Sequence, residues 1–202
     1  GDVYKRQISR QYGSGGSQVA KILAERMGVW CYDRDILTIA AERIGNEELT
    51  EDTINDLNYK RNDVASAGIT GVMGMGNIPI YNQMFLEQAK IIRKLANYGS
   101  AVFLGRCADY ILKDIKNCTS VYLYADREFR KNRVKEIYGS NAEIMDKEEK
   151  NRADYYNYYT GNRWGDINNY DFAINTSKVS FEEAADLIYR FAKDKQKNLK
   201  DR

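Results

Sequence analysis

A glycine-rich turn near the amino terminus has the residue types of a phosphate-binding loop. Three glycines, Gly13, Gly15 and Gly16, can adopt positive φ angles, so that backbone N–H groups turn toward a single anion. Ser17 then opens a helix, whose amino end adds partial positive charge. The turn predicts a phosphate site, although the loop alone fits equally well a plain connection between strand and helix capped by serine.

A second group of polar residues follows the apolar run of residues 101–104, which is typical of a buried parallel strand. Arg106 and Asp109 come directly after this run, and Asp33 ends an earlier one. Ligands of an open parallel sheet bind beyond the carboxyl ends of its strands, so we expect these side chains beside the glycine loop. The planar guanidinium of Arg106 suits a phosphate. A structural ion pair for Arg106 and a helix N-cap for Asp33 are the alternatives.

Arginines also surround a tyrosine-rich segment later in the chain. Arg152 and Arg163 bracket it, and we expect them on a lid whose aromatic residues exclude water from a site of phosphoryl transfer. Arg127, Arg130 and Arg133 recur every three residues along one helical stripe. A solvated surface is the favoured interpretation for Arg127 and Arg130.

The composition of the 202 residues excludes several kinds of chemistry. There is no histidine, which rules out imidazole bases, catalytic triads and histidine metal sites, so chemistry must use carboxylates, Lys, Arg, hydroxyls and backbone amides. Lys and Arg number 31 against 29 Asp and Glu, a balance that argues against nucleic-acid or membrane-surface binding. No signal peptide or membrane span is apparent. The cysteines Cys31, Cys107 and Cys118 have no CxxC spacing and indicate reduced thiols in the cytoplasm.

The first residues are expected to be foreign to the protein. The string DVYKRQ, residues 2–7, is similar to the translation of a transposon adapter used in sequencing libraries. We therefore expect residues 1–7 to be a non-native scar and the first strand to lack its apolar start. The remaining residues, 8–202, are predicted to form a single domain.

Strands and helices are predicted to alternate along that domain, which implies a parallel sheet covered by helices on both faces. A first strand is expected to end near Ile8. Four more strands are expected over residues 29–32, 101–104, 121–124 and 172–174. Helices are expected to follow the glycine loop, over residues 35–44 and 48–62, before Gly99, over residues 127–138, up to about Tyr159 and after Ser180. Ser180 and Glu183 have the spacing of a capping box. Residues 65–77 are expected to be a long loop.

Four segments together resemble the cytidylate kinase-like family, a branch of the P-loop nucleoside monophosphate kinases. They read ISRQYGSGGSQVAKILAERMG, WCYDRDIL, VFLGRCADYIL and RADYYNYYTGNRWGD. The resemblance implies a P-loop kinase fold with a five-stranded parallel sheet, a helical monophosphate-binding insertion over about residues 45–98 and a mobile lid over about residues 140–168. It also implies ATP and Mg²⁺ as co-substrate and cofactor, with CMP or dCMP as the acceptor.

The resemblance assigns roles to individual residues. It places the ATP phosphates on Gly13, Ser14, Gly15, Gly16, Ser17, Gln18 and Lys21, and Mg²⁺ on Ser17. It gives catalytic roles to Asp33, Arg106, Arg152 and Arg163, and binding of the acceptor to Arg106 and Asp109. Asp109 stands two residues after the position of the Asp in the family's Gly-Arg-Asp motif. The segment 175–177 resembles the Asp-Thr-Ser that follows the last strand of these kinases.

The glycine loop departs from the full consensus GxxxxGK[ST]. Arg10 stands at its first glycine and Gly16 at its lysine, so the cation that follows the transferred phosphoryl group is missing. Lys21, one helical turn further on, and Arg10 are the two candidate substitutes. Leu104 replaces the acidic residue that precedes Gly-Arg in cytidylate kinases, which removes a contact near magnesium.

Three functions therefore remain open. The first is phosphoryl transfer from ATP to a nucleoside monophosphate. The second is a kinase of a small-molecule hydroxyl, since residues 33–35 resemble the Asp-x-Asp of shikimate-type kinases and Asp33 would orient the acceptor. The third is a nucleotide-binding module without turnover, which is suggested by Gly16 at the position of the P-loop lysine. Composition does not decide between a monomer and a homo-oligomer.

Overall fold

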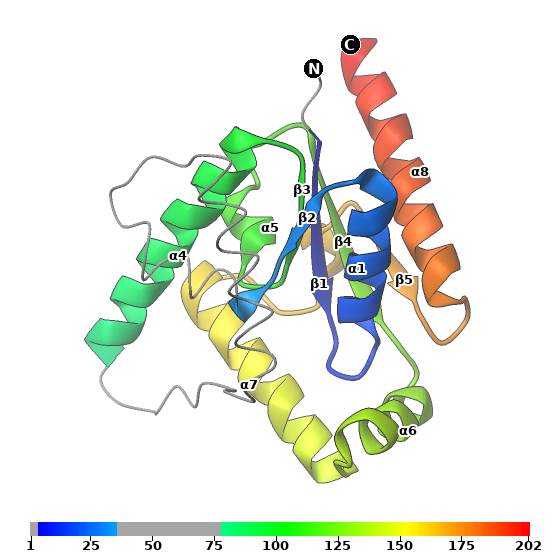
Figure 1. Ribbon diagram of the computed structural model, residues 1–202. Coiled ribbons are helices and arrows are strands. Elements are labelled where there is room, and N and C mark those ends of the chain that lie inside the picture. The colour runs from blue at the N-terminus through cyan, green and yellow to red at the C-terminus, as the bar shows by residue number, and fades with distance from the viewer. Residues whose placement is uncertain (1–3, 36–77) are drawn as a thin grey trace.

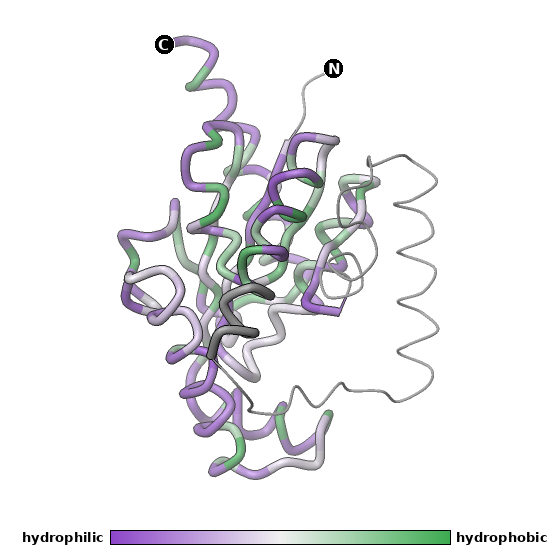
Figure 2. The backbone as a smooth tube through the Cα atoms, turned by 90° about the vertical axis from the view of Figure 1, so that its left-hand side faces the viewer, coloured by the Kyte–Doolittle hydropathy of each residue, from purple (hydrophilic) through white to green (hydrophobic). Residues whose placement is uncertain are grey.

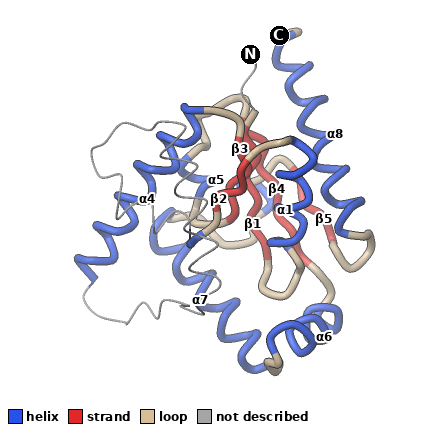
Figure 3. The backbone as a smooth tube through the Cα atoms, viewed as in Figure 1, coloured by secondary structure: helices blue, strands red, loops and turns tan. Residues whose placement is uncertain are grey.

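Five parallel strands form one sheet, in the order β2-β3-β1-β4-β5, in the computed structural model, which describes residues 4–35 and 78–202 (Figures 1 and 3). The strands are β1 (Lys5–Arg10), β2 (Trp30–Tyr32), β3 (Ala101–Leu104), β4 (Cys118–Tyr124) and β5 (Phe172–Asn175). Parallel neighbours cannot be joined by tight hairpins, so each connection crosses over the sheet. The predicted α/β fold with a five-stranded parallel sheet is confirmed.

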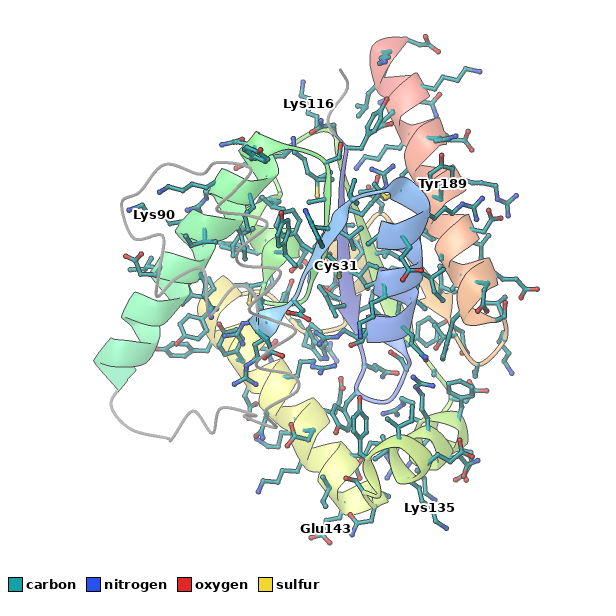
Figure 4. All side chains as sticks on the ribbon, in the orientation of Figure 1. Cys31, Lys90, Lys116, Lys135, Glu143 and Tyr189 are labelled. Atoms are coloured by element: carbon teal, nitrogen blue, oxygen red, sulfur yellow. The ribbon has the colours of Figure 1, made fainter. Side chains whose placement is uncertain are left out.

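Helices cover both faces of this sheet. They are α1 (Gly16–Met27), α4 (Ile78–Tyr98), α5 (Ala108–Ile111), α6 (Arg127–Tyr138), α7 (Ala142–Thr160) and α8 (Phe181–Lys200), with a short 3-10 helix η1 (Ile167–Asn169). Helices α1 and α8 lie side by side on one face, and α4 and α5 lie on the other (Figure 1). Helices α6 and α7 meet in an arm beyond the carboxyl ends of the strands. Figure 4 shows Lys135 and Glu143 at the tip of this arm and Lys116 at the opposite end of the molecule.

Each face of the sheet has its own apolar core, which explains why the strand segments read as short apolar runs. One core joins Ile8 and Val121 to α1 and α8, and the other joins Phe103 to α4, α5 and α7. Figure 2 shows hydrophobic segments gathered at the sheet and hydrophilic ones along the outer end of α8. No helix among the described residues is long and apolar enough to cross a membrane.

The two helices that contact the glycine loop begin in different ways. Helix α8 has the predicted capping box, in which Ser180 Oγ accepts from Glu183 N at 3.0 Å and Glu183 Oε2 accepts from Ser180 N at 2.9 Å. Helix α1 begins after Gly15, whose φ of 84° is left-handed, and no side chain caps it. The alternative of a serine-capped turn is therefore wrong, and the amino end of α1 stays open to a ligand.

The amino half of β1 is built from residues that we expected to be a scar. Lys5 pairs in register with Ala101 on one side and Cys118 on the other, so the segment lies inside the sheet. Arg6 is 2% exposed, and its Nε has no hydrogen-bond partner among the described residues. Gln7 bonds to Ser9 and Ser120 on the opposite face. The foreign origin of the segment and the missing apolar start stay predictions.

Some element boundaries differ from those expected. Strand β4 begins at Cys118 rather than Val121, and α4 begins at Ile78, with Pro79 in its first turn, where a missing N–H costs little. The predicted helices over residues 35–44 and 48–62 and the loop over residues 65–77 lie almost wholly outside the described residues. The expected insertion over about residues 45–98 is described only through α4.

Candidate active site

The glycine loop has the geometry of an anion site. Gly13 and Gly15 have φ angles of 82° and 84°, which only glycine adopts without strain. Among the described residues, the N–H groups of Gly13, Gly15, Gly16 and Ser17 donate to no acceptor. Two of these donors belong to the first turn of α1, where the helix dipole favours negative charge. The loop therefore presents a set of unpaired donors suited to phosphate oxygens.

The loop is held from behind by the rest of the fold. Ser14 Oγ donates to Gln11 O at 2.7 Å, and Thr176 Oγ1 donates to Ser14 O at 2.6 Å. A Cβ at Gly15 would overlap the ring of Phe181, which packs directly against the backbone there. Donors fixed in this way need no reorganisation when an anion arrives.

The first turns of α1 carry three exposed polar side chains close to the glycine loop. Ser17, Gln18 and Lys21 are all exposed, so they are open to a nucleotide. Gln18 Oε1 accepts from Arg133 Nη2 at 2.7 Å, and the Arg133 guanidinium lies 4.7 Å from the centre of the Phe181 ring. Helix α6 thus contributes a cation near the loop.

The other two arginines of that stripe have structural roles. Arg127 pairs with Asp146 at 2.7 Å on the surface, and both side chains are more than half exposed, which agrees with the solvated face predicted for it. Arg130 instead donates to Ala125 O at 3.1 Å and is partly buried, so the same prediction does not hold for Arg130.

A strained turn after β3 presents Arg106. Gly105, Arg106 and Cys107 have φ angles of 69°, 53° and 60°, so three residues in a row are left-handed. Arg106 Nε and Nη2 donate to Gln88 Oε1 at 3.1 and 2.9 Å, and the guanidinium stacks 4.6 Å from the centre of the Tyr155 ring. The guanidinium is therefore held by α4 and α7 together. The alternative of a structural ion pair is not what the described residues show.

Helix α7 reaches the glycine loop through two side chains that lie on one face. Arg152 Nη1 donates to Arg10 O at 2.8 Å, at the end of β1. Glu149 Oε2 accepts from Tyr12 N at 2.6 Å, and Glu149 Oε1 accepts from Trp164 Nε1 at 2.7 Å. Helix α7 is thus hydrogen-bonded directly to the backbone that leads into the loop.

Three arginines come together where these elements meet, and removal from water lowers the pKa of each guanidinium. For Arg10 burial is the main cause, followed by repulsion from Arg152 and Arg106, while Asp33 and Glu149 oppose the shift. Burial is likewise the main cause for Arg106 and for Arg152. Arginine side chains keep their proton in folded proteins, so all three carry positive charge. Three cations near two carboxylates make a region with a strong attraction for anions.

Asp109 is not beside the glycine loop, contrary to the prediction. It is 7% exposed, and Oδ2 accepts from the Tyr156 hydroxyl at 2.5 Å, which ties α5 to α7. It lines a cavity of about 820 Å³ together with Cys118, Tyr170 and Lys195, near the amino ends of β4 and β5. Burial raises the pKa of Asp109 to about 6. Asp109 lies in the first turn of α5, where its carboxylate faces Tyr156 of α7.

Arg163 is also placed apart from the cluster. It is exposed in the loop after α7, and its backbone carbonyl accepts from Asn169 Nδ2 at 3.1 Å. Within the described part of the chain its side chain contacts none of the three arginines. Of the two arginines expected on a lid, Arg152 therefore lies at the site and Arg163 lies at the surface, and the lid itself stays a prediction.

The sequence did not point to Glu149 or Gln88, which hold the site together. Both lie on long helices where polar residues are common, so neither stood out. One signal was available for Glu149: it precedes Arg152 by three residues, the spacing of neighbours on one helical face. Thr176 lies in the segment 175–177, which only the family resemblance pointed to. In the structure its hydroxyl donates to Ser14 O and so supports the glycine loop.

A magnesium ion would find few protein ligands here, which is the usual case for Mg²⁺ bound with a nucleotide. Among the described residues no group of three or more Cys, Asp or Glu side chains could hold a metal. Ser17 is exposed in the first turn of α1, and Asp33 follows β2 within electrostatic range of Arg10. One hydroxyl and one carboxylate fit an ion whose remaining ligands are phosphates and water.

Comparison with known proteins agrees with this geometry. The family model described as the cytidylate kinase-like family matches residues 7–178. No curated protein matches the chain. The structure of an uncharacterized protein from Eubacterium ventriosum is similar at 28% identity and a TM-score of 0.71, covering 94% of this chain and 98% of that one.

Two kinases share the fold at lower identity. A gluconokinase from Sinorhizobium meliloti is 14% identical with a TM-score of 0.52, covering 95% of this chain and 94% of its own. A shikimate kinase from Acinetobacter baumannii, solved in complex with shikimate, is 16% identical with a TM-score of 0.50, covering 94% of this chain and 92% of its own. At this identity they show the P-loop kinase fold alone.

Proposed function

Because the chain belongs to the cytidylate kinase-like family, we propose that it transfers the γ-phosphoryl group of ATP to a nucleoside monophosphate, with CMP or dCMP as the acceptor. The observation that carries the proposal is the meeting of Arg10, Arg106 and Arg152 beside a glycine loop whose donors are unpaired. This region can neutralise the phosphates of a donor and an acceptor at once.

The two substrates would approach from two strand ends. The ATP phosphates bind the N–H groups of the loop at the end of β1, and the monophosphate binds Arg106 at the end of β3. These strands are neighbours in the sheet, so the reacting oxygens converge between them. Arg152 lies where the two sites meet and stabilises the charge that spreads over the phosphoryl group in the transition state.

The reaction needs no strong base. A phosphate oxygen of the monophosphate attacks the γ-phosphorus, the bond from that phosphorus to the β-γ bridging oxygen breaks, and the products are ADP and a nucleoside diphosphate. The attacking oxygen is already anionic, so no proton has to be removed. Positioning and charge neutralisation suffice, which agrees with a chain that has no histidine. Mg²⁺, held by Ser17 and the phosphates, would offset negative charge on the nucleotide.

A hydroxyl acceptor is the second candidate, and the position of Asp33 favours it. This carboxylate interacts with Arg10 and follows β2, the edge strand beside β3. A carboxylate at that place could accept the proton of an attacking hydroxyl. In that case Asp33→Asn abolishes transfer and leaves ATP binding intact, whereas transfer to a monophosphate depends much less on this carboxylate.

The decisive experiment measures ADP release with Mg²⁺ and ATP over a panel of monophosphates: CMP, dCMP, UMP, AMP and GMP. Products are identified by anion-exchange chromatography. We expect turnover with CMP or dCMP and a preference over the purine nucleotides. Absence of turnover with every monophosphate rejects this function, and turnover with small hydroxyl compounds instead supports the second candidate.

A further inference from the structure

Arg10 occupies the space that a side chain at position 16 would need. A Cβ built on Gly16 would overlap Cγ of Arg10 and lie 2.6 Å from its Cβ. The aliphatic part of Arg10 therefore packs over the first residue of α1. In a complete P-loop this is where the lysine starts, so one long cationic side chain stands in the volume of another.

The far end of Arg10 reaches the turn that presents Arg106. A Cβ on Gly105 would overlap Nη1 of Arg10, so the guanidinium rests against the Gly105 backbone. The side chain thus spans from the donor loop at Gly16 to the acceptor side at Gly105. Glycine at both positions is what lets it pass.

Lys21 does not have this placement. It is exposed on α1, more than one helical turn after Gly16, and none of the contacts that surround Arg10 involve it. Arg10 in contrast interacts with Asp33, Arg106, Arg152 and Glu149. Of the two candidate substitutes for the missing lysine, only Arg10 lies between the glycine loop and Arg106.

We propose that Arg10 replaces the P-loop lysine, binding the terminal phosphates of ATP and following the phosphoryl group as it moves toward the acceptor at Arg106. The proposal rests on the phosphoryl transfer proposed above. It explains how the loop works with glycine at position 16. A guanidinium also offers more donors in a fixed plane than an ammonium, so Arg10 can contact the migrating group and Asp33 together.

The test compares Arg10→Met with Arg6→Met, a matched change on the same face of the same strand but in the core. Arg10→Met should lower transfer by about 100-fold or more, the loss typical of one donor to transition-state charge. Calorimetry should show that the variant loses affinity for MgATP and keeps most of its affinity for MgADP. Arg6→Met should leave both unchanged. Thermal melting monitored by circular dichroism checks that each variant is folded.

An exchange of positions makes the test sharper. Arg10→Gly combined with Gly16→Lys turns residues 10–17 into GQYGSGKS, which is the full consensus. Each single change should be nearly inactive, because one removes the cation and the other forces lysine against Arg10, while the double variant should recover transfer. Gly16→Lys with full activity, or a double variant no better than Arg10→Gly, would overturn the assignment.

The two proposals can fail separately. If the unsubstituted chain turns over no acceptor but Arg10→Met still loses its preference for ATP over ADP, the role of Arg10 stands and the kinase function does not. If the unsubstituted chain and Arg10→Met transfer at rates within threefold of one another, the function stands and the role of Arg10 is refuted. In that case Lys21→Met identifies whether the other candidate supplies the cation.

Discussion

Arg6 and Arg10 are the same residue type on the same face of β1, and the fold treats them in opposite ways. Arg6 lies in the core between the sheet and α8, 2% exposed, with its Nε unpaired among the described residues. Arg10 lies at the carboxyl end of the strand, where its guanidinium interacts with Asp33 and Glu149. Three residues of strand separate a cation that we expect to cost stability from one that we propose binds a ligand.

The difference shows that position along a parallel strand decides what a buried charge can do. The core between the sheet and α8 offers Arg6 little beyond one hydrogen bond from Nη1 to Lys5 O and the ring of Tyr4, so the loss of water is only partly compensated. The carboxyl end offers helix amino termini, loops with free N–H groups and the side chains of a lid. The arginines gathered there repel one another in the free protein, and a bound anion would relieve that repulsion.

The largest expected effect is at a second arginine of the carboxyl end. Arg106→Met should reduce transfer by about 100- to 1,000-fold, because an acceptor phosphate loses its partner in a desolvated site. Initial-rate kinetics should show most of the loss in kcat/KM for the acceptor, and urea unfolding should show little change. A variant that unfolds rather than losing activity would place Arg106 with Arg6 as a structural cation.

Asp109 extends the comparison to a buried group that can lose its charge. Its folded-state pKa of about 6 lies above the ordinary 3.8, so the folded protein holds the proton more tightly than the unfolded one. The free energy of unfolding should therefore fall by about 2 kcal/mol as the pH rises from about 4 to 6.

Asp109→Asn should remove this slope, as measured by urea unfolding at a series of pH values. Asp194→Asn, a change to an exposed carboxylate on α8, provides the control and should keep it. A slope that persists in Asp109→Asn would mean that other carboxyl groups produce it.

Arg6 itself should be replaceable with a gain. Arg6→Met keeps much of the side-chain volume and removes an incompletely paired cation, so the free energy of unfolding should rise by about 1–3 kcal/mol. Chemical denaturation measures the change directly. A loss of stability would show that the contacts of Arg6 with Tyr4 and Tyr189 outweigh its burial, and the contrast between the two arginines would disappear.

The smallest effect is expected behind the glycine loop. Thr176→Val keeps the shape of the side chain and removes the hydroxyl that donates to Ser14 O, at a cost of about 1 kcal/mol of stability. ATP affinity measured by calorimetry should fall only a few-fold, because the loop donors remain. Thr176→Ser retains the hydroxyl and should restore both properties.

The fold was predictable because its strands are short apolar runs that follow helices of recognisable spacing. Val102 and Val121 belong to such runs, and the sequence alone placed them in buried parallel strands. The amino half of β1 was not predictable in the same way. Lys5 and Arg6 belong to the sheet through backbone pairing with β3 and β4. Their charged side chains do not have the apolar pattern that predicts a buried strand.

The site was predictable where a residue is fixed to a strand end. Arg106 and the glycines met this condition, and they lie where the topology requires. Asp109 and Arg163 did not, because a residue in a helix or a loop can point either way, and rotation is set by packing. The bonds of Gln88 and Glu149 depend on how α4 and α7 pack against the sheet, and the spacing of residues along one helix does not determine that packing.

The hydrogen bond from Tyr12 N to Glu149 Oε2 makes one backbone amide a reporter of whether α7 is docked on the loop. This N–H is protected from solvent by a side chain of α7, and the neighbouring Arg152 holds the same helix to Arg10 O. Exchange of the Tyr12 amide with deuterium should therefore be slow while α7 is docked and should occur each time the helix lifts. Its exchange rate, measured with and without nucleotide, would report how often α7 leaves the loop in solution.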